Sequence, residues 1–94
     1  MNNKYKLFRT NTFNKSLKRA IKRGYDLRLL EDVVSMLQNG KELPKKYKDH
    51  KLIGKYNTCR ECHITPDWLL IYEIDGDKLI LYLINTGSHS DLFN

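Results

Sequence analysis

Three histidines and one aspartate are the side chains of this 94-residue sequence best suited to proton transfer: His50, His63, Asp67 and His89. Each histidine stands beside polar or turn-forming residues and not in an apolar helical stripe, so each ring can reach solvent. Imidazole takes up and releases protons near neutral pH, and a carboxylate can act as a base or orient a histidine. The set favours general acid–base catalysis, provided that the fold brings its members together.

This chemistry meets the needs of RNA cleavage without a metal ion or cofactor. A base removes the proton of a ribose 2′-OH, the oxygen attacks the adjacent phosphorus, and an acid protonates the departing 5′-oxygen. Basic side chains stabilise the extra charge on the phosphate, and a 2′,3′-cyclic phosphate is left. Ordinary roles stay open for the same residues: solvated loop histidines, a turn aspartate after Pro66, and a core position for Trp68.

The first half of the chain is predicted to be mainly helical. Asn11 or Thr12 can cap a helix whose apolar residues recur at helical spacing, and Gly24 is placed to end it. Asp26 can cap a second helix that ends at residues 39–40. The two helices should form a hairpin.

The second half of the chain is predicted to form strands. Residues 58–64, 68–74 and 78–84 are rich in β-branched, aromatic and aliphatic side chains, and turn residues separate them. A weakly alternating segment at residues 5–10 is expected to add a first strand. Residues 41–54 show no periodicity and are expected to form a long functional loop.

This order of elements predicts an α+β domain over residues 1–94, with two N-terminal helices packed on one face of a small antiparallel β-sheet. A chain of this length has room for one modest core. The opposite face of the sheet is then left for a site.

The charge of the chain favours a polyanionic partner. It has 17 Lys and Arg against 11 Asp and Glu, a formal net charge of +6. The first ten residues lack the apolar centre of a signal peptide, and no run approaches the ~18 apolar residues of a membrane helix. We expect a cytoplasmic protein that contacts nucleic acid and no membrane.

A C-x-x-C-H motif at residues 59–63 has the spelling used for haem attachment, and C-x-x-C also occurs in zinc and redox sites. A strand here would send Cys59, Glu61 and His63 to one face and Cys62 to the other, so the thiols would not converge on one ligand. Haem attachment of this kind also normally takes place outside the cytoplasm. We therefore expect no haem and no metal, and two free cysteines of which Cys62 lies in the core.

Three separated blocks resemble the YafQ-type branch of the RelE-like toxins: residues 47–54 (YKDHKLIG), 60–72 (RECHITPDWLLIY) and 86–93 (TGSHSDLF). Their order and spacing are close to those of the family, whereas the helical half agrees mainly in length and layout. The resemblance implies a RelE-like fold and the toxin of a type II toxin–antitoxin system. Such a toxin is an mRNA interferase that cuts mRNA on the ribosome and is held inactive by a cognate antitoxin protein. A non-catalytic basic module that binds nucleic acid or the ribosome is the alternative.

The resemblance also implies roles for single residues. The family's catalytic histidines and aspartate fall on His50, His63, Asp67 and His89. His89 is the expected general acid, and the other three are expected to share the base and orienting roles. The expected RNA contacts are Lys48, Arg60, Trp68, Asn85 and Phe93.

Asn85 departs from the family pattern. Relatives commonly carry an arginine at this position, where it is thought to neutralise the scissile phosphate. Asparagine can donate a hydrogen bond but brings no charge, and the loss of one charged stabiliser can cost about a hundredfold in rate. Either Arg60 or a loop lysine such as Lys48 supplies the missing charge, or the rate is lower than in those relatives.

Replacing Asn85 with arginine should therefore raise the rate of RNA cleavage, because a cation would return beside the phosphate. The measurement is the initial cleavage rate of one RNA by the wild type and by Asn85→Arg. An equal or lower rate would mean that position 85 does not face the phosphate.

Overall fold

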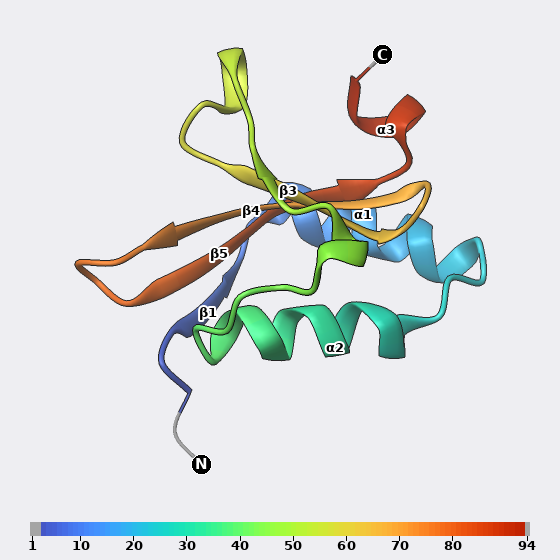
Figure 1. The fold of residues 1–94 in the computed structure, drawn as a ribbon. Coiled ribbons are helices and arrows are strands. Elements are labelled where there is room, and N and C mark those ends of the chain that lie inside the picture. Colours follow the sequence, from blue (N-terminus) through green and yellow to red (C-terminus); the bar gives the residue numbers. More distant parts are fainter. Residues whose placement is uncertain (1–2, 94) are drawn as a thin grey trace.

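A five-stranded sheet with the order β1-β5-β4-β3-β2 forms the centre of the fold (Figure 1). The computed structural model describes residues 3–93. Antiparallel pairing joins β2 to β3, β3 to β4 and β4 to β5, while β1 pairs parallel with β5. The predicted α+β class is confirmed, but the expected wholly antiparallel sheet is wrong at the β1 edge. The strands are β1 (Lys6–Arg9), β2 (His50–Lys51), β3 (Arg60–Thr65), β4 (Trp68–Asp75) and β5 (Ile80–Gly87).

Thr10 joins this edge of the sheet to the first helix. Its amide donates to the carbonyl oxygen of Leu83, and its hydroxyl donates to that of Ile84 at 2.8 Å. These bonds satisfy the edge of β5 just beyond the last β1 pair, Arg9 with Leu83. The Thr10 hydroxyl oxygen also accepts from the amide of Phe13, so Thr10 is the N-cap of α1 (Asn11–Lys22).

The helical hairpin agrees with the prediction apart from that first cap, which was expected at Asn11 or Thr12. Gly24 follows α1 with a φ of 79°, a left-handed conformation that favours glycine and ends the helix. Asp26 caps α2 (Leu27–Gln38) as predicted, because its carboxylate accepts from the amide of Arg28. None of the helices within residues 3–93 is long and apolar enough to cross a membrane.

The core lies between the two long helices and one face of the sheet. Packing is tight there, and shortening a buried leucine to alanine typically costs about 2–5 kcal/mol. Figure 1 shows α2 running along one side of the sheet and α1 behind it. The buried cluster includes Phe13 and Ala20 of α1, Leu30, Val33 and Leu37 of α2, and Cys62, Ile64, Trp68, Leu70, Tyr72, Leu81 and Leu83 of the sheet.

Residues 41–54 are more ordered than the sequence suggested. They contain the short 3-10 helix η1 (Lys45–Tyr47) and strand β2, and a second 3-10 helix, η2 (Gly54–Tyr56), overlaps their end. The prediction of one long loop is therefore wrong in part. A short C-terminal helix, α3 (His89–Phe93), was not predicted.

Asp91 fixes α3 to the rest of the protein. Its carboxylate accepts from Arg23 at 2.6 and 3.1 Å, pairs with Arg19 at 3.1 Å, and accepts from the amide of Ser88 at 2.9 Å. A Cβ atom at Gly87 would lie 2.9 Å from Asp91, so this approach needs glycine. The Arg23 guanidinium, followed by the Ser88 amide, holds the pKa of Asp91 well below its usual range.

Asp91→Asn should lower the melting temperature at pH 7, because it removes the charge that Arg19 and Arg23 contact. A carboxyl group whose pKa is lowered by folding stabilises the protein above its unfolded pKa of about 3.9, and this stabilisation is lost as the pH falls toward the folded value. The difference from wild type should therefore shrink below about pH 4. Thermal melts at pH 7 and at pH 3 measure it, with the exposed Asp77→Asn as control. A difference that is the same at both pH values would contradict this account.

Candidate active site

Three histidine rings form a row along the sheet face turned away from the core. Pairing of β2 with β3 sets His50 opposite Glu61, and the alternation of β3 puts His63 on the same face as Glu61. The ring centroids of His50 and His63 are 6.4 Å apart, and those of His63 and His89 are 5.5 Å apart. The structure therefore brings together the three histidines named from sequence.

Glu61 lies between two of these rings and was not named as a site residue from the sequence. One of its oxygens, Oε1, is 3.5 Å from Nε2 of His50 and 3.6 Å from Nε2 of His63. The residue is 4% exposed, and its other oxygen, Oε2, is buried without a hydrogen-bond partner in the described part of the chain. These distances lie within ion-pair range, so Glu61, His50 and His63 form one group of titratable side chains. Its alternation with His63 was the signal in the sequence.

His50 is oriented by the backbone before it. Nδ1 of His50 lies 2.8 Å from the carbonyl oxygen of Lys48, which can only accept, so Nδ1 carries the proton and Nε2 faces Glu61. Lys48 has a φ of 49°, a left-handed conformation that is unusual for a residue other than glycine. Such strain is often retained where it positions functional groups.

Asp67 holds His89 at the other end of the row. Its Oδ1 accepts from the backbone amide of His89 at 3.0 Å and lies 2.7 Å from Nδ1 of the same residue. The hydrogen bond from the His89 backbone amide, followed by the one from the His89 side chain, lowers the pKa of Asp67, so the carboxylate stays ionised. An ionised acceptor makes Nδ1 the donor and turns Nε2 outward.

Exposure divides the row into open ends and a sheltered centre. The side chains of His50 and His89 are 49% and 54% exposed, whereas that of His63 is 17% exposed. A solvent-borne phosphodiester can therefore reach imidazoles at both ends, with a buried carboxylate behind them. This arrangement can remove a proton at one atom and deliver one at another.

Trp68 cannot serve as an RNA contact. It is 2% exposed, its ring packs 4.9 Å from that of Tyr25, and its Nε1 donates to the hydroxyl of Thr86. A ring without exposed surface has no face on which a base could stack. The expected contact is wrong, and Trp68 is a core residue.

Arg60 is also placed differently from the expectation. It is paired with Tyr72 across the sheet and so points to the core side of β3, away from Glu61 and His63. Its guanidinium binds Asp49 at 3.0 Å, and the Tyr72 hydroxyl donates to the same carboxylate. This bond to Asp49 raises the pKa of Arg60. The expectation that Arg60 neutralises the scissile phosphate is therefore wrong.

The other expected RNA contacts are Asn85, Lys48 and Phe93. Asn85 is on the same sheet face as Glu61, because both are paired with Ile71, but its Oδ1 accepts from the hydroxyl of Ser16 at 2.6 Å and from the amide of Thr86. Lys48 is exposed and stands two residues before His50. Phe93 is 48% exposed at the end of the helix that begins with His89.

The two cysteines are free and do not form a joint site. Cys62 lies in the core, as predicted, and burial raises its pKa to about 12. Cys59 lies outside the core cluster, with its sulfur 3.7 Å from Glu73, and burial raises its pKa too. Within residues 3–93, no group of three or more His, Cys, Asp or Glu side chains has the geometry to hold a metal ion.

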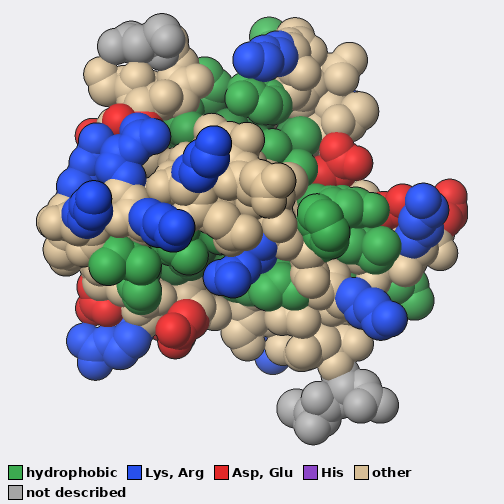
Figure 2. All heavy atoms as spheres, turned by 180° about the vertical axis from the view of Figure 1, so that it is seen from behind, with side chains coloured by type: hydrophobic (Ala, Val, Ile, Leu, Met, Phe, Trp, Pro, Cys, Tyr) green, Lys and Arg blue, Asp and Glu red, His purple; other side chains and the backbone are tan. Residues whose placement is uncertain are grey.

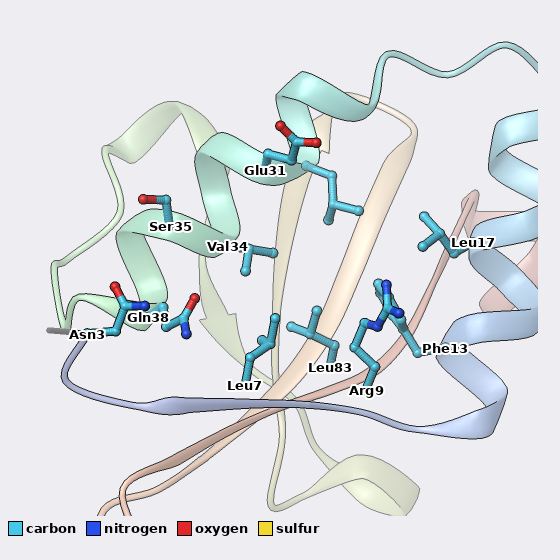
Figure 3. Close-up of a pocket in the computed structure, with 11 residues that line it drawn as sticks. Asn3, Leu7, Arg9, Phe13, Leu17, Glu31, Val34, Ser35, Gln38 and Leu83 are labelled. Atoms are coloured by element: carbon cyan, nitrogen blue, oxygen red, sulfur yellow. The ribbon is translucent and has the colours of Figure 1, made fainter. Parts of the chain in front are cut away.

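A separate cleft of about 300 Å³ lies between β1 and the two long helices (Figure 3). Leu7, Val34 and Leu83 point into it, and Arg9 and Glu31 are its charged residues. Its lining contains no histidine or cysteine. Seen from behind, the molecule shows many Lys and Arg side chains but no histidine among the described residues (Figure 2). The histidine row therefore lies apart from this cleft. The lining of the cleft suits the binding of an apolar group better than it suits proton transfer.

Comparison with known proteins places this chain in a family. A family model described as "Bacterial toxin of type II toxin-antitoxin system, YafQ" matches residues 5–94. The mRNA interferase toxin YafQ of Escherichia coli K12 is 40% identical over 82 residues, which cover 86% of this chain and 87% of that protein.

Solved structures agree with this match over almost the whole chain. The crystal structure of the E. coli DinJ-YafQ toxin-antitoxin complex contains a chain with a TM-score of 0.88 and 34% identity, covering 97% of this chain and 99% of that one. A metal-bound toxin from Helicobacter pylori has a TM-score of 0.89 and 44% identity, covering 95% and 99%. The chain therefore belongs to the YafQ family of bacterial toxins of type II toxin–antitoxin systems.

Proposed function

We propose that this chain is an endoribonuclease that cleaves mRNA by metal-independent acid–base catalysis. The observation that carries the proposal is the continuous row from His50 through Glu61 and His63 to His89 and Asp67. Four separate segments of the chain contribute to it, so it is not a product of local sequence. The E. coli relative is named an mRNA interferase toxin, which is the same activity.

The group of His50, Glu61 and His63 acts as the base. It takes the proton of a ribose 2′-OH, with Oε1 of Glu61 standing 3.5 and 3.6 Å from Nε2 of His50 and of His63. The freed oxygen then attacks the adjacent phosphorus in line with the departing 5′-oxygen. Within residues 3–93, Oε2 of Glu61 has no hydrogen-bond partner, so this oxygen is open to accept a proton.

His89 acts as the acid. Asp67 accepts the Nδ1 proton, which fixes the ring and leaves Nε2 to donate to the departing 5′-oxygen. The products are a 2′,3′-cyclic phosphate and a 5′-hydroxyl.

Charge on the phosphate is balanced by cations that flank the row. Lys48 is exposed and stands two residues before His50. Asn85 lies on the same face and offers an amide in place of a cation. The overall charge of +6 draws RNA toward the protein.

The proposed partners are those that the family resemblance implied. We propose that the substrate is mRNA on the ribosome, and that a cognate antitoxin protein in the same cytoplasm holds the toxin inactive. The solved DinJ-YafQ toxin-antitoxin complex supports an antitoxin partner. A surface with this net charge is readily covered by an acidic segment.

Analysis of the cut RNA ends tests this function. Protein stripped of metal by dialysis against a chelator is incubated with free RNA and with ribosome-bound mRNA. We expect cleavage with cyclic-phosphate and 5′-hydroxyl ends. The variant His89→Ala should cleave about 10²–10⁴-fold more slowly, because it lacks the general acid. Expression of the wild type without a partner should arrest growth, and His89→Ala should not.

The same experiment separates catalysis from plain binding. If the wild type leaves both RNAs intact while still binding them, the protein is a basic nucleic-acid-binding module and the proposal is wrong. Cleavage that is lost on metal removal and returns with added metal would contradict the metal-independent mechanism.

Glu61→Gln should slow cleavage by about a hundredfold, because an amide of the same shape cannot take up a proton. Glu73→Gln is the matched control, since Glu73 lies on the neighbouring strand and contacts Thr58 and Cys59 instead of the histidines. Single-turnover cleavage rates measure both variants, with circular dichroism to confirm folding. Equal rates for the folded Glu61 and Glu73 variants would exclude Glu61 from the base.

A further inference from the structure

A cleft of about 360 Å³ beside His63 has no role in the chemistry described so far. It lies between η1 and the turn that joins β3 to β4, two segments that are close together in Figure 1. Its apolar walls come from Leu29, Tyr47, Ile64 and Pro66. The volume falls within the roughly 300–1,000 Å³ range of small-ligand pockets.

We propose that this cleft binds a nucleobase of the RNA, namely the base of the nucleotide on the 5′ side of the cut. The proposal rests on the function proposed above and adds a specificity-determining subsite to it.

The chemistry of the cleft suits a nucleobase. Tyr47 is half-buried and packs against the core, so its ring is held in one place where a base can stack on it. Lys46 and Lys48 also line the cleft and are both exposed, so they can meet the phosphates on either side of the base. An apolar cleft bordered by two lysines fits a nucleotide better than an apolar peptide or an acidic side chain.

The position of the cleft selects the nucleotide on the 5′ side. His63 lines the cleft and belongs to the group that takes the 2′-OH proton. The base is attached to the carbon next to the one that carries this 2′-OH, so the base of the attacking ribose must lie near His63. The departing nucleotide lies instead toward His89, the open end of the row next to His63, with the two ring centroids 5.5 Å apart.

Thr65 is the uncharged polar side chain of the lining and can read the edge of the base. It is half-buried at the end of β3, and its hydroxyl can both donate and accept. Stacking on Tyr47 tolerates any base, whereas one hydroxyl in a confined space favours some base edges over others. Tyr47 therefore sets affinity and Thr65 sets preference.

The test of affinity compares two tyrosines. Tyr47→Ala should raise KM by about tenfold with little change in kcat, because a stacking contact binds ground state and transition state alike. Tyr56→Ala is the matched control: Lys55 lies 5.5 Å from the ring of Tyr56, as Lys46 lies 5.0 Å from that of Tyr47, but Tyr56 does not line the cleft. Tyr47→Leu keeps an apolar contact with the core and removes the ring, so it serves if Tyr47→Ala does not fold.

The test of preference uses RNAs that differ only in the nucleotide before or after a single cut site. Thr65→Val should change the order of rates among the four nucleotides on the 5′ side and leave the order on the 3′ side unchanged. The assay is run on free RNA or ribosome-bound mRNA, whichever the wild type cleaves.

Each failure has its own signature. A wild type that forms no cyclic phosphate overturns the proposed function. A wild type that does form it, with folded variants of Tyr47 no different from Tyr56→Ala in KM, overturns the subsite alone. A Thr65→Val preference that changes only on the 3′ side would also overturn it.

Discussion

The alternation of side chains along β3 is the constraint on which both the core and the site depend. Cys62 and Ile64 point into the core cluster, and Glu61 and His63 therefore point the other way. A shift of β3 by one residue would bury the site group and expose the core. Pairing with the neighbouring strands on both sides fixes the register, so the apolar packing also determines where the catalytic groups stand.

Much of this architecture could be predicted from the sequence because it is encoded locally. Helical periodicity and the cap at Asp26 predicted the hairpin, and turn residues predicted the β3–β4–β5 strands. The period of β3 also predicted that Cys62 would lie in the core. The histidines were recognised by residue type and by resemblance to the family, and the fold brings them together.

The features that sequence reasoning missed depend on contacts between distant residues. Arg60 is turned to the core side by pairing with Tyr72 and held there by Asp49, which no local pattern reports. A tryptophan such as Trp68 is more often a core residue than a platform for base stacking, but only its burial decides between the two. Strand alternation already put Glu61 on one face with His63, but its approach to His50 follows only from the pairing of β2 with β3. The parallel direction of β1 was missed for the same reason, because the direction of a strand depends on how the whole sheet is assembled.

The anchoring of α3 has a consequence for how the protein loses activity. This helix carries His89 and contributes no residue to the core cluster, so its hold on the body comes from the hydrogen bonds of His89 to Asp67 and the ion pairs of Asp91 with Arg19 and Arg23. Segments with few buried contacts open at a lower free energy than the whole domain unfolds. Mild heat or high salt should therefore detach α3, and His89 with it, while the sheet and the long helices remain intact. Activity would return as soon as α3 docks again. Amide hydrogen exchange would be fastest in this segment, and the toxin would behave as reversibly silenced before it behaves as denatured.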